Sequence, residues 1–282
     1  MSVAQRALRS EEHRLVQKQI DDSDWDEGVI RDFLTQRDTQ SIAVDLDDHA
    51  TLLFFGKAED VARELPTVAN QTRQMLSWLG VKGRPFVFLL FWRDDPRHCD
   101  ADEWPSRRNV NGGWTVPGSM EIVVYRREEW DRVFLHETIH TMEWDWKMPT
   151  QPLSCWGLGE KAIVAPHLFE AWTELYAEWL WCGWHGAPWS AQCDYMDAQA
   201  VQILARAKGP DWREDTNVFA YYVLKAALAP VFPFLWTFRN GETSEERNTI
   251  LCHLVTPRLA ELREAASRET PTAFSLRMTR PK

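Results

Sequence analysis

Two histidines and a glutamate in the pattern His-Glu-x-x-His constrain this chain more than any other feature of its sequence. The pattern consists of His136, Glu137 and His140. In an α-helix, residues four positions apart lie one above the other, so both imidazoles can bind one metal ion while Glu137 lies beside them. The pattern therefore predicts a helix that carries a zinc-dependent hydrolytic site.

The residues before the motif are typical of a strand followed by a helix. Residues 121–125 are rich in β-branched and aromatic side chains, which favours a strand. Glu128, Glu129 and Asp131 then place negative charge in the first turn of the expected helix, where the helix dipole favours it. A strand that leads into the motif helix is the arrangement that such a zinc site needs.

A plain amphipathic helix is the alternative interpretation of the motif. Leu135, Ile139 and Met142 would form its apolar face, and the two histidines would face solvent.

A catalytic zinc site usually has three protein ligands, so a third is needed. In the metzincin pattern it falls six residues after the second histidine, with a glycine midway. Those positions hold Trp146 and Glu143, so this pattern does not apply. The next candidates are Glu170, Glu174 and Glu178, three carboxylates on a second expected helix.

The stretch that begins at Glu170, Glu-Ala-x-x-Glu, resembles the second zinc helix of the gluzincin (thermolysin-like) metallopeptidases, whose pattern there is Asn-Glu-Ala-x-x-Asp. The resemblance covers about fifty residues and two motifs. It departs from the family at Phe169, which replaces the Asn, and at Glu174, which replaces the Asp. The 29 residues from 141 to 169 also make an unusually long spacing.

The resemblance implies one Zn²⁺ per chain, bound by His136, His140 and Glu170. Glu137 would be the general base, and Glu174 would orient a ligand histidine. A donor for the oxyanion is also needed. The candidates that we consider for it are His185, Tyr176, Tyr221 and Tyr222.

These assignments predict a zinc metallopeptidase that hydrolyses a peptide or protein substrate. The alternatives are another zinc-dependent hydrolase and a zincin-fold protein that acts as a non-catalytic binding module. The net charge of −10 argues against a sequence-independent nucleic-acid binder, which needs a basic surface, and mildly favours a cationic substrate.

We expect an intracellular protein without a signal peptide or a transmembrane segment. Five cysteines without close pairing favour a reducing compartment, and residues 1–6 have no apolar signal core. Residues 218–238 are apolar, but Lys225, Pro230 and Pro233 interrupt them, which favours a buried, broken helix. Cys182, His185 and Cys193 could form a second metal site, although their spacing fits no standard zinc pattern.

The pattern of elements predicts an α+β fold, and the resemblance implies that it is zincin-like, with a small mixed sheet and the active-site helix in an N-terminal lobe and a mainly helical C-terminal lobe. The strand at 121–125 is either an edge strand that pairs with the substrate or an ordinary internal strand. Further strands are expected at 51–55 and 86–91, and helices at 58–79, 168–182, 194–207, 217–229 and 243–266. The expected organisation is an acidic N-terminal arm (1–48), a metallopeptidase domain (49–266, with lobes at about 49–146 and 147–266) and a loose tail (267–282).

Overall fold

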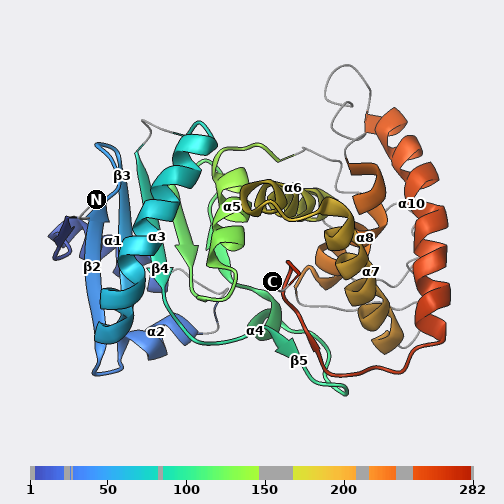
Figure 1. Ribbon diagram of the computed structural model, residues 1–282, viewed down its shortest axis with the longest axis horizontal. Coiled ribbons are helices and arrows are strands. Elements are labelled where there is room, and N and C mark those ends of the chain that lie inside the picture. Colours follow the sequence, from blue (N-terminus) through green and yellow to red (C-terminus); the bar gives the residue numbers. More distant parts are fainter. Residues whose placement is uncertain are drawn as a thin grey trace. The chain divides into compact units, whose positions relative to one another are not determined.

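The chain divides into two compact units, each made from two separate stretches of sequence. Unit 1 comprises Met1–Pro96 and Asn111–Trp144, and unit 2 comprises Arg97–Val110 and Asp145–Lys282. The expected α+β class is confirmed, because unit 1 holds a mixed sheet with helices and unit 2 is mainly helical (Figure 1). The computed structural model describes residues 4–21, 26, 28–81, 85–145, 168–207, 216–232 and 244–280.

Unit 1 is built around a six-stranded mixed sheet with the spatial order β1-β2-β3-β4-β7-β6 (Figure 1). The pairs β3–β4 and β4–β7 are parallel, and the remaining three pairs are antiparallel. The strands are β1 (Gln5–Arg6), β2 (Thr39–Asp45), β3 (Ala50–Lys57), β4 (Phe86–Phe91), β6 (Gly113–Thr115) and β7 (Glu121–Val124).

Both faces of the central strand β4 are covered, which explains its uninterrupted apolar sequence. On one face, the ring of Phe88 lies 4.7 Å from that of Phe134 in helix α5 (Trp130–Thr141). On the other face, Leu89 belongs to a buried cluster with Phe33 of helix α2 (Val29–Leu34) and Val16 of helix α1 (Ser10–Asp21). The strand expected at 86–91 is confirmed by these bounds.

Helix α3 (Ala58–Trp78) connects the parallel strands β3 and β4 and packs against β2 and β3. It lies within one residue of the expected range. Gly80 has a φ of 70°, a conformation that favours glycine and that ends the helical path.

The range expected to form an acidic arm, residues 1–48, contains ordered elements of unit 1. Strand β2 pairs with β3 along its whole length, from Thr39 opposite Lys57 to Asp45 opposite Thr51. Arg6 binds the carboxylates of both Glu12 and Asp45, each at 2.7 Å, and so ties β1 to α1 and β2. The described residues of this range therefore include two strands and two helices of unit 1.

The strand expected at 121–125 is internal, so the second of its two interpretations is correct. Strand β7 has β4 on one side and β6 on the other. The strand at this edge of the sheet is β6. The sequence does not predict β6, because the strand is only three residues long, begins with a glycine and lies in a turn-rich stretch. Pairing of a substrate strand with β7 is thereby excluded.

Unit 2 packs its helices around one apolar core. Residue 243, the first of the helix expected at 243–266, lies outside the described residues. The expected lobe boundary at 146–147 also lies outside them. The elements are β5 (His98–Cys99), α4 (Arg107–Val110), α6 (Leu168–His185), α7 (Trp189–Arg206), the π-helix η2 (Phe219–Leu224), α8 (Lys225–Leu228), the 3₁₀ turn η3 (Ala229–Val231), α10 (Ser244–Ser267) and β8 (Phe274–Ser275).

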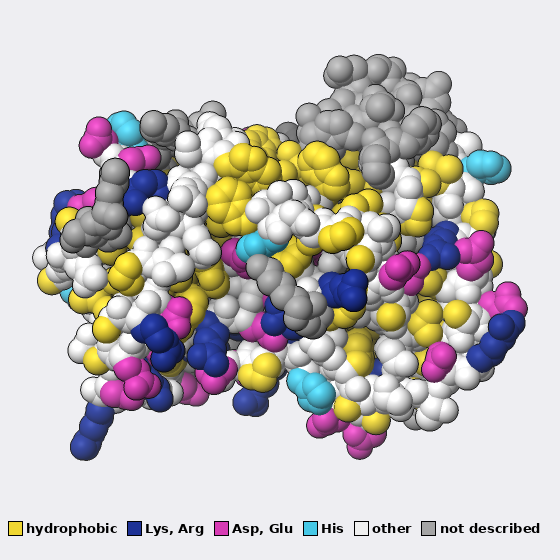
Figure 2. Space-filling view, viewed as in Figure 1, with side chains coloured by type: hydrophobic (Ala, Val, Ile, Leu, Met, Phe, Trp, Pro, Cys, Tyr) yellow, Lys and Arg dark blue, Asp and Glu magenta, His cyan; other side chains and the backbone are white. Residues whose placement is uncertain are grey.

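The apolar segment 218–238 is a buried, irregular helix as far as it is described. It begins as η2, continues as α8 and ends in η3, and Phe219, Val223 and Leu228 are buried in the core of unit 2. Among the described residues, no helix has the length and apolar character that crossing a membrane requires. On the face shown in Figure 2, acidic and basic side chains are interspersed.

Candidate metal centre

Helix α5 presents the His-Glu-x-x-His motif, and both of its ends are sharply defined. It begins after Glu129, which has a left-handed φ of 57°, and Val133 donates its N–H to the Glu129 carbonyl at 2.9 Å. It ends in a Schellman motif, in which Glu143 donates to the His140 carbonyl at 3.0 Å and Trp144 to the Ile139 carbonyl at 2.9 Å. Glu143 occupies the left-handed position with a φ of 52°.

The two histidines of the motif lie one above the other, as their spacing predicts. Their Nε2 atoms are 2.9 Å apart, and their ring planes are inclined by 76°. Two nitrogens bound to one zinc ion at about 2.05 Å in a tetrahedral arrangement are roughly 3.3 Å apart. The pair therefore needs to separate by only a few tenths of an ångström to bind one metal ion.

The motif is buried, and the amphipathic helix with solvent-facing histidines is wrong. Exposure is 5% for His136, 8% for His140 and 6% for Glu137. The apolar side chains of α5, among them Phe134 and Leu135, are fully buried as well, so the helix is enclosed on every side.

Helix α5 is also fixed to the edge of the sheet. The hydroxyl groups of Thr141 and Thr115 lie 2.9 Å apart, and Thr115 also donates to the Glu121 carbonyl at 2.6 Å. No sequence pattern marks Thr115 or Thr141 as a pair, because they are 26 positions apart and neither belongs to the motif.

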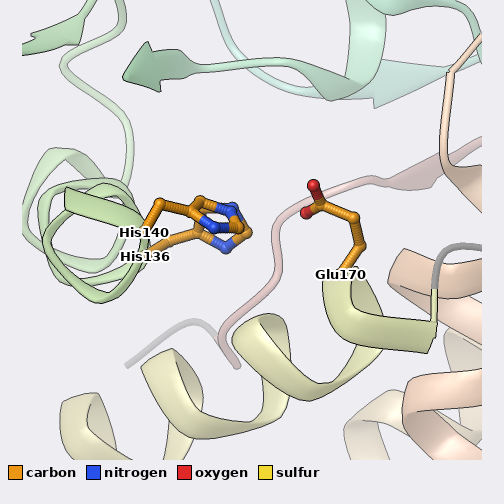
Figure 3. A group of neighbouring side chains, drawn as sticks. All are labelled: His136, His140 and Glu170. Atoms are coloured by element: carbon orange, nitrogen blue, oxygen red, sulfur yellow. The ribbon is translucent and has the colours of Figure 1, made fainter. Parts of the chain in front are cut away.

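His136, His140 and Glu170 could hold a metal ion. Each offers one ligand atom, and these atoms all lie within 4.8 Å of one another. Figure 3 shows the two imidazoles projecting side by side from α5, and the Glu170 carboxylate from the first turn of α6. The set of two imidazole nitrogens and one carboxylate oxygen is one that catalytic zinc sites use.

The three carboxylates of α6 differ in their surroundings. Glu170 is half-buried, whereas Glu174 and Glu178 are buried. Glu178 forms an ion pair with Lys225 and accepts a hydrogen bond from Gln192 at 2.7 Å. Glu178 is thus bound inside unit 2, and the alternative that it is the third ligand fails.

The candidates for an oxyanion donor all lie in unit 2. Tyr222 is buried, and its hydroxyl donates to the Leu276 carbonyl at 2.8 Å, which occupies its only proton. Asn217 donates to the Tyr221 hydroxyl at 3.4 Å. Each of the other two contacts a tryptophan ring. The ring centroids are 6.4 Å apart for Tyr176 and Trp179, and 4.5 Å apart for His185 and Trp181.

The expected alternative metal site at Cys182, His185 and Cys193 does not form. Within the described ranges, the one group of three or more metal-binding side chains is that of His136, His140 and Glu170. Burial raises the pKa of the Cys182 thiol to about 12, with a contribution from Glu178, and burial also raises that of Cys193 to about 11. Both thiols are therefore protonated at neutral pH in the metal-free protein.

The cysteines are not all free, which the sequence did not indicate. Cys99, Cys182 and Cys193 are free, but Cys252 is disulfide-bonded. The argument from unpaired cysteines to a reducing compartment therefore loses its support.

Comparison with known proteins identifies no relative: no family model matches the chain, and neither a curated protein nor a solved structure matches it significantly.

Proposed function

We propose that the protein is a zinc-dependent peptide hydrolase of the gluzincin type, with one zinc ion bound by His136, His140 and Glu170. The observation that carries the proposal is the convergence of the three ligand atoms within 4.8 Å. The three residues come from two motifs that are 29 residues apart in the sequence, and the proposal requires both.

Glu137 is the general base in this proposal. Zinc held by these three residues would lower the pKa of its water to near 7 and would polarise the carbonyl group of the substrate. The carboxylate of Glu137 takes one proton from the attacking water and later delivers it to the leaving amine, which is the task of a positioned general acid–base group. Two observations support this role: Glu137 directly follows His136 on α5, and it is shielded from solvent, with 6% exposure.

Glu174 has a positioning role in this proposal. Its carboxylate accepts the free ring N–H of one ligand histidine and so fixes the tautomer and the orientation of that ring. Two observations support it: Glu174 lies one helical turn after Glu170, and its side chain is buried, with 3% exposure.

The substrate in this proposal is an extended peptide that pairs with the edge strand β6. The β6 strand has a neighbour on one side only among the described strands, namely β7, and it packs against α5. Extended peptides bind such edges through main-chain hydrogen bonds. The Thr115–Thr141 contact would keep that edge in a constant position beside the motif helix.

The test is the metal content of the purified protein after reconstitution with zinc, followed by a screen of a degenerate peptide library. We expect one zinc ion per chain, and we expect His136→Ala and His140→Ala to abolish binding. His185→Ala is the matched control, because His185 belongs to the alternative ligand set and should not affect zinc. Zinc that persists in His136→Ala but is lost in His185→Ala would overturn the assignment, and stoichiometric zinc without cleavage of any peptide would favour a binding module.

A further inference from the structure

Residues 272–280, the C-terminal segment, are bound to unit 2 in the way that a protein binds a peptide ligand. Gln192, Gln199 and Arg206 of α7 bind its main chain. Gln192 donates to the Met278 carbonyl at 2.7 Å, Gln199 to the Ser275 carbonyl at 3.0 Å, and Arg206 to the Thr272 carbonyl. These three side chains are spaced by seven residues each, so they form a row along one face of the helix.

Other groups complete this binding. The N–H of Arg280 donates to the Gln192 side chain at 3.0 Å, and the N–H of Thr272 to that of Gln202 at 3.1 Å. The Leu276 main chain is bound on both sides: its carbonyl accepts from Tyr222 at 2.8 Å and its N–H donates to the Arg97 carbonyl at 3.1 Å. This range was expected to be a loose tail, yet its main-chain groups are bound by side chains from several elements.

The side chains of the C-terminal segment also enter the core of unit 2. Leu276, Met278 and Thr279 are at most 1% exposed. By contrast, residues 267–270, which connect the segment to α10, are exposed. The C-terminal segment is thus buried in unit 2, whereas the residues that connect it to α10 are accessible to solvent.

Met278 contacts a buried ion pair between α6 and α8. Lys225 and Glu178 form this pair with 0% exposure of either side chain, and the Met278 sulfur lies 3.5 Å from the Lys225 ammonium group. Gln192 joins the two sides, because its amide donates both to Glu178 and to the Met278 carbonyl, each at 2.7 Å. Without the segment, Gln192 loses partners and one wall around the ion pair is missing.

Glu178 lies on the same face of α6 as Glu170, two turns further along the helix, or about 12 Å. A buried charge that loses its enclosure is strongly disfavoured, so the surrounding elements rearrange to hydrate it or pair it again. The C-terminal segment is linked to Glu178 by Gln192, which donates to both Glu178 and the Met278 carbonyl, and by Lys225, which contacts the Met278 sulfur.

We propose that the C-terminal segment is a peptide ligand held within its own chain, that it positions α6 through Glu178, and that its binding sets the affinity of the metal centre. The second half of the proposal depends on Glu170 being a zinc ligand, as proposed above. Glu178, Gln192 and Met278 are positioning residues in this scheme, since none of them is assigned to the metal.

The first test separates the segment from the chain after folding. A protease recognition sequence is inserted between Glu269 and Thr270, the full-length protein is purified and cut, and the segment is removed by washing. We expect faster amide hydrogen exchange in α6 of the metal-free protein and a zinc Kd weakened about 10-fold, at the lower end of the effect of positioning groups at metal sites. A synthetic peptide of residues 272–280 should restore both values, and a scrambled peptide should not.

The second test uses point variants of the intact chain and does not require the segment to dissociate. Met278→Ala and Leu276→Ala each remove a buried side chain of the same segment, but only Met278 touches Lys225. We expect Met278→Ala to weaken zinc binding about 10-fold and to accelerate exchange in α6, and Leu276→Ala to change the zinc Kd less than twofold.

The outcomes distinguish this inference from the proposed function. If the full-length protein binds no zinc, the proposed function fails, and the exchange of α6 amides still tests whether the segment positions the helix. If zinc binds and both α6 exchange and the zinc Kd are unchanged in the cut protein and in Met278→Ala, the inference fails while the proposed function remains. Equal loss of affinity in Met278→Ala and Leu276→Ala would also overturn the role of the ion pair.

Discussion

The Nε2 atoms of His136 and His140 are 2.9 Å apart on one turn of α5. At this distance either Nε2 atom could donate a hydrogen bond to the other, depending on the tautomer of each ring. A metal ion bound by both Nε2 atoms would need both of them deprotonated, and the rings would have to move apart slightly. The metal-free pair is thus already close to the arrangement that a metal ion requires.

The roles of Glu170 and Glu174 can be separated by substitution. Glu170→Ala should abolish zinc binding, because it removes one of three ligands, whereas Glu174→Ala should weaken binding by roughly 10- to 100-fold. Isothermal titration with zinc, in competition with a chelator, measures both values. The opposite ranking would assign the ligand to Glu174.

Catalysis and metal binding can be separated at Glu137. Glu137→Gln keeps the size of the side chain but removes the proton acceptor, so hydrolysis of a library-selected peptide should fall by roughly 10²- to 10⁴-fold at unchanged zinc content. Glu143→Gln, on the exposed residue after the helix, is the matched control and should retain activity. Loss of zinc in Glu137→Gln would show that the geometry of the motif is misinterpreted.

The left-handed residue after α5 should limit stability. A residue with a β-carbon at a φ of 52° is strained, and Glu143 is exposed, so Glu143→Gly should raise the free energy of unfolding by about 1 kcal/mol. Glu143→Ala retains the β-carbon and should bring no such gain. Urea denaturation of the three proteins measures the difference, and equal gains for glycine and alanine would contradict the strain.

The buried thiols should make stability depend on alkaline pH. Burial raises the pKa of Cys182 to about 12, from an ordinary value of 9.0, so between these values the unfolded chain releases a proton that the folded protein keeps. Stability is therefore present below pH 9 and falls above it, by at most about 1.4 kcal/mol per pH unit for this thiol. Urea unfolding from pH 8 to pH 10.5 should show a smaller decline for Cys182→Ala than for the unmodified protein.

Pairing of the substrate with β6 predicts a dependence on peptide N–H groups. Methylation of alternate amide nitrogens in a cleaved peptide should weaken binding strongly in one register and little in the other, because only every second residue of an extended strand points its N–H toward a given neighbour. A competition assay with the two sets of methylated peptides measures this. Equal effects in both registers would argue against strand pairing.

The sequence predicts best those elements whose residues have one consistent task. Strand β4 is apolar throughout because both of its faces are covered, and the motif helix α5 follows from the spacing of His136 and His140. The Glu-Ala-x-x-Glu pattern on α6 also indicates Glu170 as the third metal ligand. Only the structure excludes Glu178 from that role, because its partners are Lys225 and Gln192. In these elements local pattern and tertiary packing agree.

The missed features depend on partners that are distant in the sequence. Strand β2 lies among acidic residues, and only its pairing with β3 makes it a strand. Lys225 interrupts an apolar stretch and is fully buried because Glu178, 47 positions earlier, neutralises it, a partner that the local sequence does not reveal. In the C-terminal segment β8 pairs with β5 and side chains of α7 bind other main-chain groups, and no local sequence pattern marks these distant partners.

The two-stranded sheet of unit 2 limits when this unit can fold during synthesis of the protein. Strand β5 includes His98, and its partner in β8 is Ser275, so the strands are made far apart in time. Domains form as the chain emerges from the ribosome, so β5 cannot pair with β8 until nearly all later residues of unit 2 have been translated. Unit 1 has its last strand and its motif helix by Thr141, and it can therefore fold while unit 2 is still being made.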